Sequence, residues 1–181
     1  MAHLSTPLVP GTYARVERER RFLLAAAPES LPGPARRITD RYLTGTRVRL
    51  RRADRPDGPP ELKLTQKIPA DRPAGGVQGL ITTAYLSPAE YDVFAALPAR
   101  VLRKSRYSLP PLGVDVFEPP LHGLVLAEAE FGSDEEAAAF AGPAAAVAEV
   151  SHDPRFSGGR LSATDRPELL RWLAGFGIRP Q

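Results

Sequence analysis

Apolar and polar residues alternate with a period of two over most of the chain, which is the pattern of half-buried β-strands. Eight runs of this kind follow one another, at residues 14–24, 38–43, 47–52, 61–68, 77–86, 101–109, 113–118 and 123–131. Clusters of glycine, proline and aspartate separate several of them, most clearly "ADRPDGPP" at residues 53–60 and "PADRPAGG" at residues 69–76. We therefore expect a chain built mainly from antiparallel strands joined by turns and loops.

Three helices are predicted among and after the strands. Residues 87–90 and 133–136 each form a capping box, the first with proline at the first helical position and the second before an alanine-rich segment. The third helix is predicted over residues 164–177 and begins at Thr164 or Asp165. Its apolar stripe predicts packing against the core and consists of Leu169, Leu170, Trp172, Leu173 and Phe176.

The length of 181 residues suits one domain with its own core, or at most two small ones. We expect a single domain over residues 1–181, with residues 1–13 as a loose lead-in. Glycine pairs at residues 75–76 and 158–159 predict turns, because neither opens an obvious helix after a strand as a phosphate-binding loop does.

The charged residues of each run share one face of the predicted strand, because alternate side chains point to opposite faces. In the first run Glu17, Glu19 and Arg21 lie together, opposite Val16 and Phe22. Later runs repeat this with Arg47, Arg49 and Arg51, with Lys63 and Lys67, with Lys104 and Arg106, with Asp115, and with Glu128 and Glu130. Like charges two residues apart repel each other, which is tolerated more readily where a ligand of opposite charge fills the space.

Two arrangements fit this pattern equally well. An antiparallel sheet normally has one face in water, so the charges could simply cover the wet face of an open sheet. Alternatively, eight antiparallel strands are enough to close a barrel, with the charged faces inside and the apolar faces packed outward against the helices.

Composition narrows the class of protein further. No stretch of about 18 consecutive apolar residues is present and the N-terminus does not read as a secretory signal, so we expect a cytoplasmic protein without a membrane span. The absence of cysteine excludes disulfides and thiolate chemistry. The net charge of +3 does not by itself indicate a nucleic-acid partner. Of the 24 basic residues only Lys63, Lys67 and Lys104 are lysines, and all three fall on charged faces.

A closed barrel would gather both signs of charge in one space. Its interior would hold the cations Arg21, Arg47, Arg49, Arg51, Lys63, Lys67, Lys104 and Arg106 and the acids Glu17, Glu19, Asp115, Glu128 and Glu130. A surplus of cations suits a polyanion, and paired carboxylates suit a hard divalent cation. Polyphosphate together with Mg²⁺ or Mn²⁺ satisfies both sets of charges.

The same segments resemble the CYTH superfamily, the triphosphate tunnel metalloenzymes. "VERERRFLL" resembles the Glu-x-Glu-x-Lys signature of the family's first strand, here with Arg21 in the last position. "RYLTGTRVRLRR", "ELKLTQK", "LRKSRY", "GVDVFEPPLHGLVLAEAEF" and "VSHDPRFSGGRLS" resemble later family blocks in the same order. The resemblance covers about residues 14–163. The Glu-x-Glu motif alone is weak evidence, whereas six blocks in order are fairly specific.

This resemblance implies a β-rich α+β fold, an eight-stranded antiparallel tunnel with a charged interior and flanking helices. It implies a metal-dependent hydrolase of a small triphosphate, with inorganic tripolyphosphate as the default substrate and Mg²⁺ or Mn²⁺ as the cofactor. The implied metal ligands are Glu17, Glu19, Asp115, Glu128 and Glu130, with Glu17, Glu19 and Arg21 as the catalytic residues. The implied phosphate-binding residues are Arg47, Arg49, Arg51, Lys63, Lys67, Lys104, Arg106 and Arg155. Neither a nucleic acid nor a membrane is an expected partner, and both a monomer and a homodimer remain open.

Three departures from the family pattern keep other functions open. Arg21 replaces a lysine and stays protonated, so it is a poor activator of water. The fifth strand, "GLITTAYL", lacks the glutamates of many relatives, and Phe156 and Gly158 stand where tyrosine and asparagine are common. The alternatives are a triphosphatase for thiamine triphosphate or nucleoside triphosphates, and a module that binds polyphosphate or nucleotide without cutting it. A nucleic-acid-binding barrel is less well supported, because the strands carry few aromatic platforms.

Overall fold

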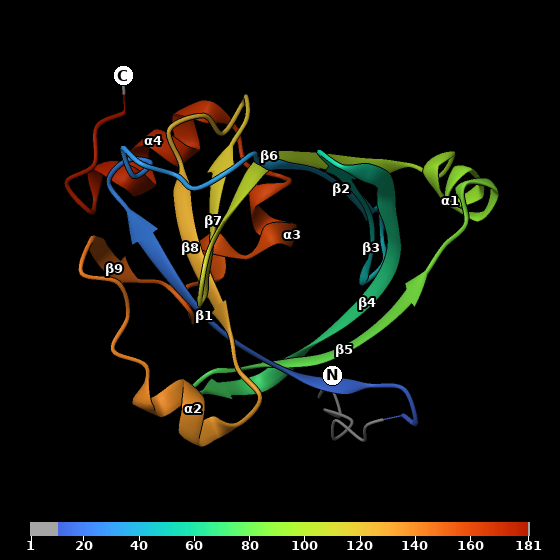
Figure 1. Ribbon diagram of the computed structural model, residues 1–181, viewed down its shortest axis with the longest axis horizontal. Helices are drawn as coiled ribbons and strands as arrows, with labels where there is room; N and C mark the ends of the chain where they lie inside the picture. Colours follow the sequence, from blue (N-terminus) through green and yellow to red (C-terminus); the bar gives the residue numbers. More distant parts are fainter. Residues whose placement is uncertain (1–10, 181) are drawn as a thin grey trace, which may run out of the picture.

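Eight antiparallel strands close into a barrel in the computed structural model, which describes residues 11–180 apart from the side chains of residues 72–74 (Figure 1). The strands are β1 (Arg15–Leu24), β2 (Arg36–Leu43), β3 (Val48–Arg55), β4 (Gly58–Ala74), β5 (Val77–Tyr85), β6 (Ala99–Leu109), β7 (Leu112–Phe117) and β8 (Val125–Glu130). Neighbours run β5-β4-β3-β2-β6-β7-β8-β1, and a β5–β1 pairing completes the ring. The predicted closed barrel is confirmed, and the open sheet with one wet face is wrong.

Strand β1 closes the barrel by changing partner along its length. Its first half, Arg15 to Arg18, pairs with β5, and its second half, Glu19 to Leu24, pairs with β8. A register shift between Glu17 and Arg18 marks the change, as β-bulges at barrel closures do. The charged stretch at residues 17–21 therefore lies at the seam of the barrel.

The hairpins that β4 forms with β3 and with β5 are longer than the sequence indicated. The segments at residues 53–60 and 69–76 were predicted as loops, but β3 continues to Arg55 and β4 runs from Gly58 to Ala74. Only the short connection between Arg55 and Gly58 and the turn at residues 75–76 remain outside the strands. The prolines at residues 69 and 73 are accommodated because β4 pairs irregularly with β5 between Pro69 and Ala74.

The alanine-rich segment is also different from its prediction. Helix α2 (Asp134–Ala139) has only six residues, and a further strand, β9 (Ala146–Glu149), follows it and pairs with the second half of β1. The helix ends at Ala139 because Phe140 is already extended. Gly142 lies in the connection to β9, where its φ of +78° suits glycine and a Cβ would lie 2.8 Å from the ring of Phe22. Alanine is depleted in strands, so residues 146–149 gave no strand signal.

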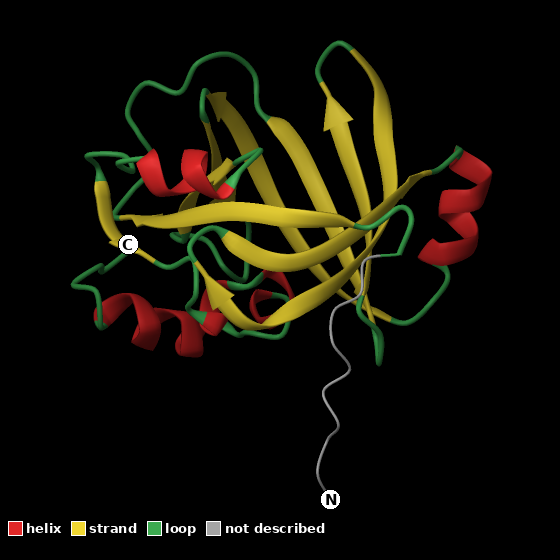
Figure 2. Ribbon diagram, turned by 90° about the horizontal axis from the view of Figure 1, so that it is seen from below, coloured by secondary structure: helices red, strands yellow, loops and turns green. Residues whose placement is uncertain are grey.

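The other helices begin at the predicted caps. Helix α1 (Pro88–Ala95) starts at the capping box of Ser87 and Glu90, and α4 (Arg166–Ala174) starts at Asp165. Residues 158–159, predicted as a turn, instead begin the short helix α3 (Gly158–Leu161), which follows the 3₁₀ turn η1 (Pro154–Phe156) and is capped by Ser157. Figure 2 shows α1 alone on one side of the strands, with the remaining helices on the other.

The lead-in predicted for residues 1–13 falls mostly outside the described residues. Its last three residues form a turn before β1, in which the amide of Ala14 donates to the carbonyl oxygen of Gly11 at 2.9 Å. Among the described residues, no helix combines the length and apolar character needed to cross a membrane.

The main hydrophobic core fills one end of the barrel. Leu23, Leu102 and Leu126 lie on the same strand faces as Arg21, Lys104 and Glu128, so the inner faces change from apolar to charged along each strand. These leucines pack against η1, α3 and α4, through Phe156, Leu161, Leu169 and Leu173, which are at most 2% exposed. The helical stripe predicted to pack against the core is confirmed by Leu169 and Leu173.

The outer faces form a second, smaller cluster. Phe22, Leu24, Val114, Val125 and Ala127 are buried there, with Leu31 and Phe140 packed against them. The prediction that apolar faces pack outward is therefore correct only for this part of the wall, because the larger core lies at an end of the barrel.

We predict that Leu173→Ala lowers the free energy of unfolding by about 2–5 kcal/mol, because Leu173 is fully buried in the core at the end of the barrel. Chemical denaturation followed by circular dichroism measures this change. Val93→Ala on α1 is the control, since Val93 is 69% exposed and its truncation should cost less than about 0.5 kcal/mol. Equal losses in the two variants would show that α4 does not close the barrel.

Candidate active site

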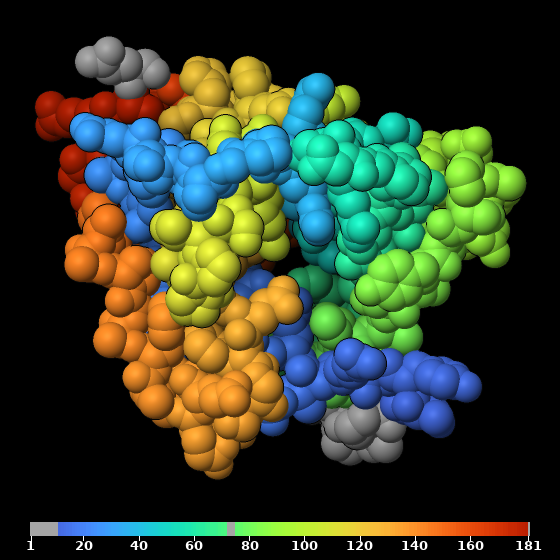
Figure 3. All heavy atoms as spheres, in the orientation of Figure 1, coloured from blue at the N-terminus to red at the C-terminus, as the bar shows by residue number. Residues whose placement is uncertain are grey.

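The remainder of the barrel interior is a charged cavity of about 600 Å³, a volume typical of small-ligand sites. Figure 3 shows the hollow between the blue strand β1, the green and teal strands β3 to β5 and the yellow strands. Its cationic lining consists of Arg15, Arg21, Arg49, Arg51, Lys63, Lys67, Lys104 and Arg106, and its acidic lining of Glu17, Glu19, Glu128 and Glu130. Phe156, Gly158 and Leu161 line it from the side of the hydrophobic core.

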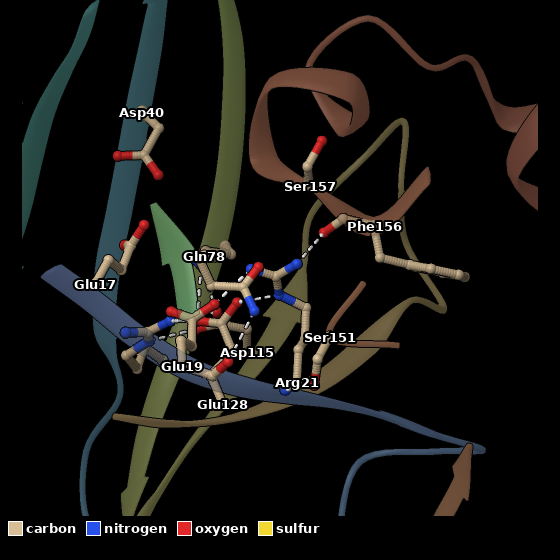
Figure 4. Close-up of polar contacts among 12 residues, drawn as sticks. Glu17, Glu19, Arg21, Asp40, Gln78, Asp115, Glu128, Ser151, Phe156 and Ser157 are labelled. Carbon is tan, nitrogen blue, oxygen red and sulfur yellow. Dashed lines mark hydrogen bonds and ion pairs between the residues drawn. The ribbon is translucent and has the colours of Figure 1, made fainter. Parts of the chain in front are cut away.

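Arg21 joins three elements at the centre of the site. Its guanidinium donates hydrogen bonds to Glu19, to Glu128 at 3.1 Å and to the carbonyl oxygen of Phe156 at 3.1 Å, as Figure 4 shows. Each nitrogen of the group is thus engaged by β1, β8 or the loop before α3. The two glutamates hold the pKa of Arg21 above its usual range although burial acts against the charge. Arg21 therefore remains a fixed cation.

The pKa values of the two glutamates beside Arg21 are shifted in opposite directions. Burial and the neighbouring Glu128 raise the pKa of Glu19, although Arg21 and Lys67 oppose this. Burial also acts to raise the pKa of Glu128, but Lys104, Arg106 and Arg21 hold it well below its usual range. Glu128 is therefore the strongly stabilised anion of the pair, and Glu19 is the less compensated one.

Asp115 lies behind the cavity wall. Its carboxylate is fully buried and accepts hydrogen bonds from Lys104 and, at two oxygens, from Arg106 at 2.6 Å. Arg106 also contacts Glu128. In this arrangement Asp115 orients the two cations that face the cavity, and both of its oxygens are occupied by them.

The structure adds Asp40, a residue that the sequence did not single out. Asp40 is 1% exposed and accepts two hydrogen bonds from Arg51, at 2.6 and 2.7 Å, while the Nε of Arg49 lies 3.7 Å away. Although burial acts to raise the pKa of Asp40, the two arginines and Lys104 hold it well below its usual range. A signal was present in the second run, where Asp40 and Tyr42 share one strand face with the apolar Ile38, and this face proved to be internal.

The wall formed by β4 and β5 contributes lysines and hydroxyl groups to the cavity. Lys67 donates to Glu17 at 2.5 Å, and Lys63 lies 2.7 Å from Glu61 and over the ring of Tyr85 at 5.0 Å. Thr83 of β5 hydrogen-bonds Thr65 of β4 at 3.1 Å, and Ile81, Thr83 and Tyr85 line the cavity. The fifth strand therefore contributes no carboxylate, as its sequence indicated.

Two predicted phosphate-binding residues do not join the others. Arg47 precedes β3, is exposed and does not line the cavity. Arg155 is engaged by Asp153 through a hydrogen bond of 2.6 Å and lies over the rings of Phe156 and Phe176. Arg49, Arg51, Lys63, Lys67, Lys104 and Arg106 all line the cavity as the sequence suggested.

The acidic residues of the cavity offer oxygen atoms that could bind a divalent metal. Register places Glu130 directly opposite Glu19, with Glu17 two residues along the same face of β1. Carboxylate oxygens are the ligands that Mg²⁺ and Mn²⁺ prefer, and Glu130 forms no ion pair within residues 11–180 as described. In the conformation seen, however, no three acidic or histidine side chains of the described chain converge closely enough to hold an ion. The donor set fits a hard cation once Lys67 releases Glu17, because Arg21 donates to one oxygen of Glu19.

Among known proteins, similarity to this chain is found in solved structures. No family model matches the chain, and no curated protein matches its sequence. A solved structure of the hypothetical protein NE1496 is 28% identical, with a TM-score of 0.53, and the match covers 82% of this chain and 99% of that one. A structure of the inorganic triphosphatase NE1496 is 26% identical over 83% of this chain and 96% of its own, again with a TM-score of 0.53.

The similarity extends over nearly the full length of NE1496 and over more than four fifths of this chain. It agrees with the ring of eight antiparallel strands, the inward charges and the order of the sequence blocks. The chain therefore has the triphosphate tunnel fold of the CYTH superfamily.

Proposed function

We propose that this protein is a divalent-metal-dependent triphosphatase that hydrolyses inorganic tripolyphosphate inside its barrel. One observation carries the proposal: cations from β1, β3, β4 and β6 surround a closed-walled cavity that also holds four glutamates on β1 and β8. The similarity to NE1496, an inorganic triphosphatase, supports the same activity. The ligand is a small polyanion, since the wall offers charge-assisted hydrogen bonds around the whole cavity.

The arginines and lysines of the wall would hold and orient the phosphate chain. Arg49, Arg51 and Arg106 offer planar forks that match phosphate oxygens, whereas Lys63 and Lys104 act as point charges. Positioning and charge neutralisation supply most of the catalysis in phosphoryl transfer, so this wall can perform the main part of the work.

Glu17, Glu19 and Glu130 would hold the metal, with Mg²⁺ or Mn²⁺ as the ion. When bound, the ion neutralises charge on phosphate oxygens and makes a bound water more acidic. The chain must first exchange internal pairs for ligand contacts, because Glu17 is held by Lys67 and Glu19 by Arg21. Lys67 would then be free to contact phosphate.

Binding without hydrolysis is a second candidate function, favoured by the geometry of Arg21. Arg21 is fully engaged by Glu19, Glu128 and the carbonyl of Phe156 and stays charged, so it neither accepts a proton nor moves easily. Calorimetry combined with phosphate release separates the two functions. Tight binding of tripolyphosphate with no release favours a binding module, and any metal-dependent release excludes it.

We predict that the purified protein releases phosphate from tripolyphosphate with Mg²⁺ or Mn²⁺ and that a chelator stops the release. Glu17→Gln and Glu19→Gln should each lower kcat by about 10- to 100-fold or more, since even outer partners of a metal change activity by that much. A colorimetric phosphate assay measures this, with thiamine triphosphate and ATP as the comparison substrates.

Glu29→Gln is the matched control, because Glu29 is an exposed glutamate between β1 and β2 and lines no part of the cavity. It should retain full activity. Equal activity in the wild type and both cavity variants would mean that the release does not occur at this site.

We predict that Arg49→Gln raises the KM for tripolyphosphate about 10- to 100-fold, because a hydrogen bond to a charged group contributes about 1.5–3 kcal/mol. Arg47→Gln makes the same change two residues earlier, before β3 begins and outside the cavity, and its KM should remain within about twofold of the wild type. Steady-state kinetics at saturating metal measures both. If Arg47→Gln caused the larger loss, phosphate would bind at the entrance rather than inside the barrel.

A further inference from the structure

A buried acid on the neighbouring strand holds one arginine of β3 and lies within ion-pair distance of a second. Register places Asp40 of β2 directly opposite Arg51 of β3, and Tyr42 directly opposite Arg49. Both oxygens of Asp40 accept from the guanidinium of Arg51, at 2.6 and 2.7 Å. The carboxylate itself is 1% exposed and is absent from the lining of the cavity, whereas both arginines line it.

Arg49 carries a donor that the described protein does not satisfy. Its Nε is buried and has no hydrogen-bond partner among the described residues, with the nearest Asp40 oxygen at 3.7 Å. Buried donors are normally paired, and an exception beside a cavity calls for an explanation. A phosphate oxygen brought by a ligand is an acceptor of suitable charge for a guanidinium in this position.

Tyr42 and Gly158 limit the space next to these arginines. A Cβ at Gly158 would overlap the hydroxyl of Tyr42, so the ring reaches the start of α3. Burial raises the pKa of Tyr42 to about 12, which keeps the hydroxyl protonated at neutral pH. The two arginines are therefore bounded by β2 on one side and by the α3 end of the cavity on the other.

We propose that Asp40 is a positioning residue that fixes Arg49 and Arg51 as a preorganised pair for a phosphoryl group. This inference rests on the proposed function and adds to it a residue that never touches the substrate. A free arginine side chain samples many rotamers and must lose that freedom on binding. The bidentate contact with Asp40 removes this freedom for Arg51 in advance, and the same carboxylate attracts the guanidinium of Arg49 at 3.7 Å.

If only the negative charge of Asp40 mattered, its removal would have the opposite effect on binding, so an experiment can separate the two roles. Asp40 places a negative charge close to the groups that would bind an anion, so its removal raises the positive potential of the cavity. If Asp40 served only as a counter-charge, Asp40→Asn would bind tripolyphosphate more tightly. If Asp40 positions the arginines, the same substitution weakens binding.

The experiment compares Asp40→Asn with Asp54→Asn by calorimetry with tripolyphosphate and by steady-state kinetics. Asp54 is the matched control, because it pairs with Arg52 at 2.8 Å on the outside of the barrel, where both are about half exposed. We expect Asp40→Asn to raise Kd and KM at least about tenfold with kcat within about threefold, as for a lost binding contact. Asp54→Asn should match the wild type. Unchanged or tighter binding by Asp40→Asn overturns the inference.

A second set of variants tests the same proposal if Asp40→Asn does not fold, since removing one partner of a buried ion pair is destabilising. Arg51→Gln and the double variant Asp40→Asn/Arg51→Gln should bind tripolyphosphate equally weakly, because Asp40 acts through Arg51. The prediction would be contradicted if the double variant bound tripolyphosphate more weakly than Arg51→Gln by the same factor that Asp40→Asn costs alone, or by more than about tenfold. Wild-type protein that does not bind tripolyphosphate would refute the proposed function as well, whereas normal binding by Asp40→Asn would refute only the role of Asp40.

Discussion

The structure depends on the neutralisation of cations that a closed barrel forces into one interior. Burying an unpaired charge is so costly that each wall cation needs an acidic partner or a ligand. Asp40 and Asp115 meet this need from behind the wall, at Arg51 and Arg106, while Glu17, Glu19 and Glu128 meet it within the cavity. A triphosphate therefore replaces existing pairs rather than entering an uncompensated positive field, and this exchange selects for ligands of high negative charge.

The acids divide into two groups by accessibility, and the division suggests different roles. Asp40 and Asp115 are at most 1% exposed and have both oxygens bound, so they can set the direction of a guanidinium but have no oxygen left for a metal. Glu17 and Glu130 face the cavity, and Glu130 has no ion-pair partner within the described chain. The hydrophobic end closed by α3 and α4 keeps this arrangement rigid, because the same strands carry both the leucines and the charges.

Much of the barrel could be predicted because period-two alternation is a local property of the strands. Alternation along the strand placed Glu17, Glu19 and Arg21 on one face. This face points into the barrel because β1 pairs with both β5 and β8 where the barrel closes. Features set by distant contacts could not be read in this way. Strand β9 exists because β1 has a free side beyond Arg18, and the position of Arg47 depends on where β3 begins. Asp40 was missed because a lone acid gains its role from Arg51 on another strand.

A crystal structure with tripolyphosphate and Mn²⁺ tests the central claim most directly. We expect phosphate oxygens on Arg49, Arg51, Lys104 and Arg106 inside the barrel, with Asp40 and Asp115 still bound to their arginines. We also expect Mn²⁺ on Glu17, Glu19 or Glu130, identified by its anomalous signal, and Lys67 released from Glu17. Tripolyphosphate bound outside the barrel, or metal bound to Asp115 in place of its cations, would contradict the account.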